Sequence, residues 1–180
     1  MKAVFLDRDG TVTAGIPYIE RVDSVDKVQL LPTVLEALTM LAALEYEVFL
    51  VTNQAGIAEG LITLEQFDEI NARALELMAP SGVQVRKTYL CPHGEGAICD
   101  CRKPKPGMLL EAAREFDIDL GSSWMVGDRV SDIETGANAG TKTILVLSGV
   151  PGTVAPNTTY TASTLLDAVR YIADQSKGDD

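Results

Sequence analysis

Residues 3–11 read AVFLDRDGT, a short apolar run followed directly by two acidic residues. Such a run is typical of a buried strand, and Asp7 and Asp9 stand at its end. Side chains two residues apart on a strand project to the same side, so we expect the two carboxylates to lie together. Two like charges that close are costly without a cation, and Mg²⁺ prefers a few carboxylates with phosphate oxygens and water. A carboxylate beside Mg²⁺ can also attack phosphorus, so the stretch indicates phosphoryl chemistry, although Asp-Gly is an ordinary turn signal as well.

The composition is that of one globular domain. The chain has 180 residues, of which 46% are hydrophobic and 23% charged, and its net charge is −11. We expect a single domain over residues 1–175 and a disordered tail over residues 176–180. The acidic balance argues against nucleic-acid and membrane partners, and no segment has the length of a membrane span or a secretory leader. We therefore expect a cytoplasmic monomer that acts on a small phosphorylated metabolite.

Short apolar runs alternate with segments of helical periodicity along the chain. The expected strands are residues 3–6, 48–51, 88–90, 124–126 and 144–147. The expected helices cover residues 34–44, 64–78, 107–116, 132–138 and 165–172, with a capping box of Thr63 and Gln66 and with Ser163 as the cap of the last helix. This alternation predicts an α/β fold, a Rossmann-like three-layer αβα sandwich with a central parallel sheet.

Polar residues follow the expected strands. In a parallel sheet the ligand lies beyond the carboxyl ends of the strands, where such residues meet. Thr52 and Asn53 follow the second strand, and Asp128 and Asp132 follow the fourth. Thr52 can offer its hydroxyl and nearby N–H groups to a phosphoryl oxygen, and Asp128 can complete a Mg²⁺ shell with Asp7. Asp132 can ligate through water, orient a ligand or simply favour a helix N-terminus.

Basic residues are scarce in this chain, yet several fall near the expected site. Lys103 can neutralise charge on a phosphoryl group, and Arg102 can grip a substrate with its planar fork. A solvated basic surface is the ordinary alternative for such residues. The clustered residues are Arg8, Arg102, Lys103, Lys105 and Arg129.

The three cysteines and the only histidine lie within residues 91–101. An odd number of cysteines in one short segment is not a disulfide framework and favours a reducing compartment. Four such ligands suit tetrahedral Zn²⁺, and no open position remains, so we expect a structural zinc site. Free thiols beside an exposed histidine are the alternative. The expected ligands are Cys91, His93, Cys99 and Cys101.

Taken together, these segments resemble the haloacid dehalogenase-like phosphatase superfamily. The matching motifs are DRDGT at residues 7–11, VTNQ at 51–54, CRKPKPG at 101–107 and GDRVSD at 127–132. The resemblance implies a phosphomonoesterase with Asp7 as the nucleophile that forms an aspartyl-phosphate and Asp9 as the general acid and then base. It also implies Thr52 and Lys103 as stabilisers of the phosphoryl group. The implied Mg²⁺ ligands are Asp7, Asp128 and the backbone carbonyl of Asp9, and we expect Asp7 and the substrate phosphate to raise the pKa of Asp9.

No insert in the chain is large enough for a cap domain, so selectivity must come from loops. The zinc loop and PGM at residues 106–108 make the chain similar to the capless heptose bisphosphate phosphatases, whereas the short gap between His93 and Cys99 resembles the histidinol-phosphate phosphatases. The first resemblance implies removal of the 7-phosphate from D-glycero-D-manno-heptose 1,7-bisphosphate, and the second implies histidinol phosphate as substrate. The substrate contacts implied by the resemblance are Tyr18, Asn53, Gln54, Arg102 and Arg129.

Three alternatives stay open at this point. Histidinol phosphate would need an acidic residue near the substrate amine, and the candidates are Glu20, Glu59 and Glu95. A zinc-stabilised binding module that has lost turnover is a second alternative, which the intact motif residues argue against. A polynucleotide 3′-phosphatase shares the fold type, but the net charge of −11 disfavours it.

Overall fold

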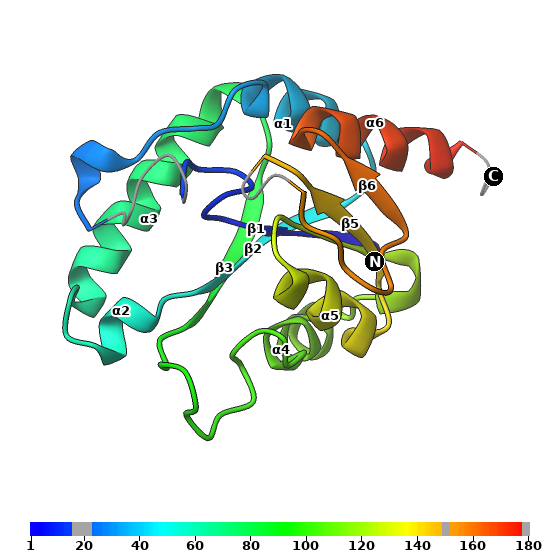
Figure 1. Ribbon diagram of the computed structural model, residues 1–180. Helices are drawn as coiled ribbons and strands as arrows, with labels where there is room; N and C mark the ends of the chain where they lie inside the picture. Colours follow the sequence, from blue (N-terminus) through cyan, green and yellow to red (C-terminus); the bar gives the residue numbers. More distant parts are fainter. Residues whose placement is uncertain (16–22, 149–151, 178–180) are drawn as a thin grey trace.

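A parallel six-stranded sheet forms the centre of the computed structural model, which describes residues 1–15, 23–148 and 152–177 (Figure 1). The strand order is β3-β2-β1-β4-β5-β6, so the N-terminal strand lies near the middle. Every pairing between neighbouring strands is parallel, which confirms the expected Rossmann-like α/β architecture. The strands are β1 Ala3–Asp7, β2 Glu47–Asn53, β3 Val85–Cys91, β4 Trp124–Gly127, β5 Lys142–Val146 and β6 Tyr160–Ala162.

Helices cover both faces of this sheet. Figure 1 shows α1, α3 and α6 on one side and α4 and α5 on the other, which gives the three layers. Among the described residues, the segments between strands and helices carry only short helical turns, as a capless architecture requires. The helices are α1 Val34–Ala42, α2 Ala55–Ala58, α3 Leu64–Met78, α4 Gly107–Phe116, α5 Val130–Ala139 and α6 Leu165–Ser176, with 3-10 turns at Val25–Lys27, Ala79–Ser81 and Leu120–Ser122.

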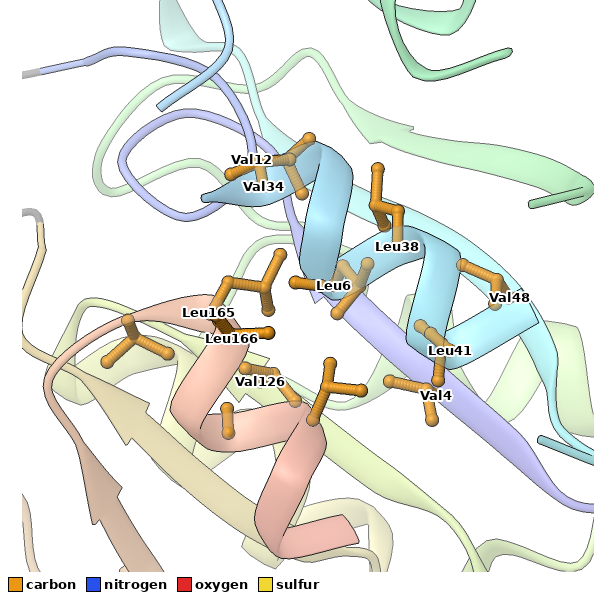
Figure 2. Close-up of a cluster of buried hydrophobic side chains, with 14 of the residues drawn as sticks. Val4, Leu6, Val12, Val34, Leu38, Leu41, Val48, Val126, Leu165 and Leu166 are labelled. Atoms are coloured by element: carbon orange, nitrogen blue, oxygen red, sulfur yellow. The ribbon is translucent and has the colours of Figure 1, made fainter. Parts of the chain in front are cut away.

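The two faces of the sheet carry separate hydrophobic cores because side chains alternate along each strand. On β2, Val48 and Leu50 pack with α1 and α6, the cluster drawn in Figure 2. Phe49 and Val51 pack on the opposite face, with α4. Each of these side chains is almost completely buried. Burial of that kind contributes about 1.5–3 kcal/mol per large aliphatic side chain, so both faces hold the central strands rigidly.

The same alternation decides where the polar residues at the strand ends point. On β1, Phe5 faces α4, so Asp7 two residues later projects to the α4 side as well. On β2, Val51 faces α4, so Asn53 follows it to that side, and Thr52 points to the other. The strand geometry alone therefore places the side chains of Thr52 and Asn53 on opposite faces of the sheet.

Helix caps agree with the sequence pattern at one helix and differ at another. At α3 the hydroxyl of Thr63 accepts the N–H of Gln66, and the Gln66 side chain accepts the N–H of Thr63, which confirms the capping box. At α6 the expected cap, Ser163, is wrong by one residue. Thr164 has the extended backbone and accepts the N–H of Asp167 at 3.2 Å, while the helix itself begins at Leu165 as expected.

The strand β6 has no counterpart in the sequence pattern. Of its residues only Ala162 is buried, because β6 pairs with β5 on a single side and stands at the edge of the sheet. In α3, Leu64 is 52% exposed, and the buried face is made of Phe67, Ile70, Ala74 and Met78.

The last helix ends close to the C-terminal limit of the described residues. The helix α6 ends at Ser176, and residues 178–180 lie outside the described residues, so the expected tail and the boundary at residue 175 stay predictions. Within the described ranges, no helix has both the length and the apolar character needed to cross a membrane.

Candidate active site

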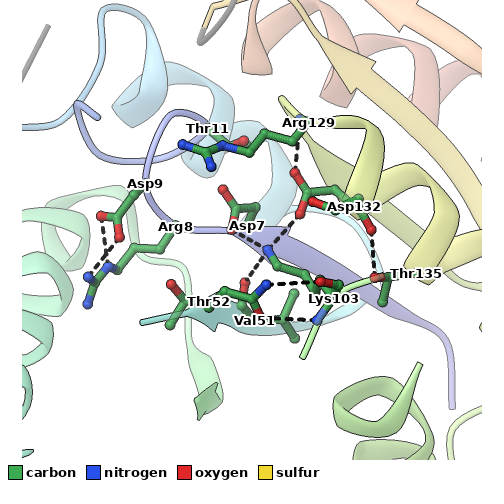
Figure 3. Close-up of polar contacts among 12 residues, drawn as sticks. Asp7, Arg8, Asp9, Thr11, Val51, Thr52, Lys103, Arg129, Asp132 and Thr135 are labelled. Carbon is green, nitrogen blue, oxygen red and sulfur yellow. Dashed lines mark hydrogen bonds and ion pairs between the residues drawn. The ribbon is translucent and has the colours of Figure 1, made fainter. Parts of the chain in front are cut away.

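Lys103 joins two buried aspartates at the carboxyl edge of the sheet (Figure 3). Its Nζ lies 2.5 Å from Oδ1 of Asp7 and 2.6 Å from Oδ1 of Asp132. It also donates to the backbone oxygen of Val51 at 3.2 Å. Asp7 ends β1, Val51 lies near the end of β2 and Asp132 lies in the first turn of α5, so three distant segments meet on one ammonium group. The structure thus brings together the expected nucleophile and the expected basic residue.

The charges of this cluster do not balance. Burial raises the pKa of Asp7 well above its usual range; Lys103 opposes that shift, while Asp132 and Asp128 add to it. Burial, and then the charge of Asp132, raise the pKa of Asp128 too. Burial disfavours the charged form of Lys103, but Asp132 and Asp7 outweigh it and raise its pKa, so Lys103 is an ammonium. One oxygen from each carboxylate lies within 4.8 Å of the others. Lys103 and the charge of Arg129, which acts on Asp128, offset only part of the three negative charges, and a bound cation would offset the rest.

The surroundings of Asp128 fit a Mg²⁺ ligand. Its Oδ1 accepts the hydroxyl of Thr11 at 3.2 Å, but its Oδ2 is buried and has no hydrogen-bond partner among the described residues. Gly10, at a φ of +102°, packs against this carboxylate so closely that a Cβ there would lie 2.5 Å from Oδ2. Buried oxygens of this kind are costly unless a partner completes them, and a hard cation is such a partner.

The two-residue spacing predicted that the carboxylates of Asp7 and Asp9 lie together, and this prediction is wrong. The strand β1 ends at Asp7, and the chain turns through Gly10, so the alternation of side chains no longer applies. Figure 3 shows Asp9 turned away from Asp7 and paired with Arg8. The Arg8 guanidinium donates to both oxygens of Asp9, at 3.0 and 2.9 Å, and the hydroxyl of Thr13 donates at 3.0 Å.

The electrostatics of Asp9 correct a second expectation. Burial raises its pKa, but the charge of Arg8 and hydrogen bonds from Arg8, Gln54 and Thr13 outweigh burial and lower it. We expected Asp7 and the substrate phosphate to raise this pKa. The dominant neighbour is instead Arg8, whose side chain is 1% exposed and packs 5.0 Å from the centre of the Phe67 ring.

Gln54 connects Asp9 to Thr52. Its Nε2 donates to Oδ2 of Asp9 at 2.7 Å and to the hydroxyl oxygen of Thr52 at 2.9 Å. Because the Thr52 oxygen accepts this bond, its own proton is free to donate to another oxygen. Thr52 is almost fully buried at the end of β2, so the position of that donor is fixed.

A cavity of about 710 Å³ opens above these groups. Asp7, Asp9, Thr52 and Lys103 line one part of it. The cavity is also lined by basic and polar side chains from the zinc loop, the segment after it and α5, namely Glu95, Arg102, Lys105, Arg129 and Ser131. Asn53 and Gln54 reach the cavity too, whereas Tyr18 lies outside the described residues.

The cysteine and histidine side chains come together in a second cluster. The sulfurs of Cys91 and Cys101 are 2.8 Å apart, and Nδ1 of His93 lies 3.2 Å from Cys101 and 3.5 Å from Cys91. With Cys99, all four residues have a ligand atom within 4.8 Å of the others. Burial and the neighbouring thiols raise the pKa of Cys101 to about 12, the result expected for crowded thiols without a cation. Three thiols and an imidazole in this arrangement fit tetrahedral Zn²⁺.

Two contacts of the site were missed by reasoning from the sequence. The partner of Asp9 is its own neighbour Arg8, and no periodicity or spacing signals that such a side chain folds back. Asp132 was considered a ligand or a helix-end carboxylate; it caps α5 through the N–H of Arg129 at 3.0 Å and also pairs with Lys103. The available signal for the second role is that a buried lysine needs counter-ions.

Comparison with known proteins is consistent with this geometry. A HAD-hydrolase-like family model matches residues 100–169. The D-glycero-beta-D-manno-heptose-1,7-bisphosphate 7-phosphatase of Pasteurella multocida is 44% identical over 157 residues, which cover 83% of this chain and 84% of that protein. The D-glycero-alpha-D-manno-heptose-1,7-bisphosphate 7-phosphatase of Campylobacter jejuni is 37% identical over 147 residues, 82% of this chain and 83% of that protein.

A solved structure extends the similarity to nearly the whole chain. The D,D-heptose 1,7-bisphosphate phosphatase of B. bronchiseptica, in complex with magnesium and phosphate, superimposes with a TM-score of 0.88 at 32% identity. The match covers 97% of this chain and 99% of that one.

Proposed function

The chain belongs to the haloacid dehalogenase-like phosphatases and, within them, to the heptose bisphosphate phosphatase family, so we propose that it removes the 7-phosphate from D-glycero-D-manno-heptose 1,7-bisphosphate. It is a phosphoric monoester hydrolase. The observation that carries the substrate proposal is the composition of the cavity lining. The same cavity is lined by the buried carboxylates with Lys103 and by further basic side chains, as a substrate with two phosphates requires.

Asp7 is the group proposed to attack phosphorus. One of its oxygens is held by Lys103, which fixes the carboxylate in one orientation for an in-line approach. Attack forms an aspartyl-phosphate and releases the sugar alcohol; water then cleaves that bond and regenerates Asp7. Lys103 and the hydroxyl of Thr52 are placed to stabilise the charge of the phosphoryl oxygens in both steps.

Asp7, Asp128 and the backbone carbonyl of Asp9 are the residues that would hold Mg²⁺. The unpartnered Oδ2 of Asp128 and the excess of negative charge support this assignment. When bound, the cation would supply charge neutralisation for the carboxylates and the phosphoryl group.

Asp9 is the group proposed to move protons. It gives a proton to the leaving alcohol oxygen in the first step and accepts one from the attacking water in the second. The contact with Arg8 favours the ionised form, which is the form that the second step uses. Asp9 lines the cavity, and a leaving oxygen can reach its carboxylate once one of the hydrogen-bond donors of Asp9 moves away.

Arg102 and Arg129 are the proposed contacts of the second phosphate, with Gln54 and Tyr18 as further substrate contacts. Arg102 also donates to the backbone oxygen of His93 at 2.9 Å, so the zinc loop helps to hold its guanidinium near the cavity. Lys105 donates to the backbone oxygen of Cys99 and is held in the same way. We propose that Zn²⁺, bound by the cysteines and His93, fixes this loop.

A histidinol-phosphate phosphatase is the second candidate. The observation in its favour is Glu95, which lines the cavity and could bind an amine. Three basic side chains line the same cavity, Arg102, Lys105 and Arg129, and favour an anionic group there instead. A binding module without turnover is disfavoured because the acidic and basic groups of the expected catalytic set lie within contact distance. We further propose a cytoplasmic monomer, since the thiol cluster suits a reducing compartment.

Steady-state kinetics would test the proposal. We would measure kcat/KM with Mg²⁺ on both anomers of the heptose bisphosphate and on histidinol phosphate. A preference of about 100-fold for one heptose anomer, about 2.7 kcal/mol of transition-state binding, is expected. The relatives carry names for both anomers, so either anomer is compatible with the family. A reversed preference would make histidinol phosphate the substrate, and equal weak rates would point to another phosphomonoester.

A further inference from the structure

We propose that Asn53 is a positioning residue that sets the backbone of Lys103, and that its side chain does not act as a contact for substrate. The Oδ1 of Asn53 accepts the backbone N–H of Lys103 at 3.1 Å, and its Nδ2 donates to the backbone oxygen of the same residue at 3.2 Å. A single carboxamide therefore satisfies both main-chain polar groups of Lys103, as a neighbouring strand would.

The strand geometry explains why Asn53 is available for this task. Side chains alternate along β2, so Asn53 follows Phe49 and Val51 to the face that α4 covers. The segment that carries Lys103 leads into α4 and lies on that same face, where Lys103 also donates to the oxygen of Val51. Thr52 projects to the opposite face and reaches the phosphoryl site separately.

Lys103 needs such support because its own segment has no regular structure. It lies between the zinc loop and α4, where the chain makes a turn closed by the N–H of Lys105 and the oxygen of Arg102 at 2.9 Å. Its Nζ must nevertheless meet Asp7 and Asp132 at hydrogen-bond distance. The core strand β2, through Asn53, supplies a fixed reference, so that the ammonium group is held where charge develops.

A direct role in substrate binding makes a different kinetic prediction. Asn53 is half-buried and lines the cavity, and its carboxamide keeps one N–H and one lone pair after the two bonds to Lys103. If that residual capacity bound substrate, loss of the side chain would raise KM. If the side chain positions Lys103, its loss displaces a group used in the transition state and lowers kcat. The inference rests on the proposed role of Lys103.

The experiment is a double-mutant cycle between Asn53→Ala and Lys103→Ala, with Mg²⁺ and p-nitrophenyl phosphate as the probe. We expect Asn53→Ala to lower kcat by about 30- to 100-fold, since a misplacement of about 1 Å can cost that much, with KM within about threefold. In the Lys103→Ala background the second substitution should lower kcat by less than about threefold, because the group that it positions is gone. Asn53→Asp keeps the acceptor for the N–H and should give an intermediate loss.

Asn138→Ala is the matched control. Asn138 donates from its own carboxamide to the oxygen of the adjacent Pro104 at 3.1 Å, but it does not line the cavity. Its replacement should leave kcat within about twofold, because Asn53 still holds both main-chain groups of Lys103. Melting curves of all variants, measured beside the kinetics, separate misfolding from a loss of position.

Two results would overturn the inference. One is a raised KM at unchanged kcat, with losses that multiply in the double mutant, which would make Asn53 a substrate contact. The other is full activity of Asn53→Ala. The proposed function would fail in a different way: Lys103→Ala alone would then keep full activity.

Discussion

The two clusters of metal-ligating side chains differ in support and in access. Asp7 and Asp128 stand at the ends of central strands and are buried, and they share a cavity with Lys103. In the cysteine cluster only Cys91 is buried; it ends β3, and the other ligands lie on a loop whose residue Ile98 is fully exposed. One cluster has excess charge, an unpartnered oxygen and an open side, whereas the other has four ligand atoms close enough for one tetrahedral ion. We therefore propose the chemistry for the first cluster and a structural role for the second.

The clusters are nevertheless joined by a short piece of chain. Cys101 is the last residue of the cysteine cluster, and Lys103, two residues later, belongs to the carboxylate cluster. Arg102 lies between them and contacts the backbone of the loop. The comparison therefore predicts that damage to the carboxylate cluster abolishes chemistry and spares the fold, while damage to the zinc loop weakens both in part.

The largest effect is expected from Asp7→Asn. Loss of the nucleophile should lower kcat by about 10⁴-fold or more, measured as phosphate release. The melting temperature should stay the same or rise, because burial already disfavours the charge of Asp7. Residual activity above about 1% of wild type, checked with a second preparation to exclude contamination, would contradict the assignment.

An intermediate effect is expected from Cys99→Ser. Loss of one ligand should release Zn²⁺, measured by elemental analysis, and lower the melting temperature by about 5–10 °C, since about 2–3 kcal/mol corresponds to that shift in a chain of this size. The KM for the bisphosphate should rise about tenfold, because Arg102 loses the backbone that holds it. Ile98→Ser, next to the same ligand but fully exposed, should keep zinc and activity. Unchanged melting and kinetics after zinc loss would separate the loop from the site.

The smallest effect concerns pH and magnesium. The raised pKa values of Asp7 and Asp128 mean that the folded, magnesium-free protein holds protons that the unfolded chain releases above about pH 4. Its stability should therefore fall as pH rises from about 5 to 8, by a few degrees in melting temperature, and Mg²⁺ at pH 8 should restore it.

A pair of variants isolates that effect from the general acidity of the surface. Asp128→Asn should shrink the difference in melting temperature between pH 5 and pH 8, because one of the crowded carboxylates is gone. Asp26→Asn removes an exposed carboxylate and should leave the difference intact. Equal responses in both variants would mean that net charge, and not the cluster, sets the dependence.

The sequence was informative about the parts of the site that strand ends deliver. Asp7, Thr52 and Asp128 each follow an apolar run, and a parallel sheet gathers such residues at one edge, so their proximity follows from topology. The cysteine spacing predicted the second cluster in the same way. The strand β6 could not be predicted from the sequence, because its segment has neither a continuous nor an alternating apolar pattern.

The pattern of apolar and polar residues along the chain did not predict the contacts of individual side chains. The two-residue spacing of Asp7 and Asp9 suggested a shared orientation, but it holds only while the strand continues, and β1 ends at Asp7. The pairing of Asp9 with Arg8 depends on a turn whose path residue types alone do not give. The side of the sheet on which Asn53 lies does follow from the sequence, because strand alternation puts it on the opposite face from Thr52.

The hydrogen bonds around Asp9 leave it no spare lone pair. A carboxylate has about four acceptor sites, and Arg8 takes two of them, with Thr13 and Gln54 taking one each. On the proposed mechanism, a proton or a water molecule can reach Asp9 only when a donor leaves, and Gln54 is the donor that Thr52 shares. A phosphoryl oxygen can accept the proton of Thr52 while Gln54 still donates to the Thr52 oxygen, so the amide can stay in place when substrate binds. With all four bonds formed, the proposed acid–base group is held out of use until one of its donors turns away.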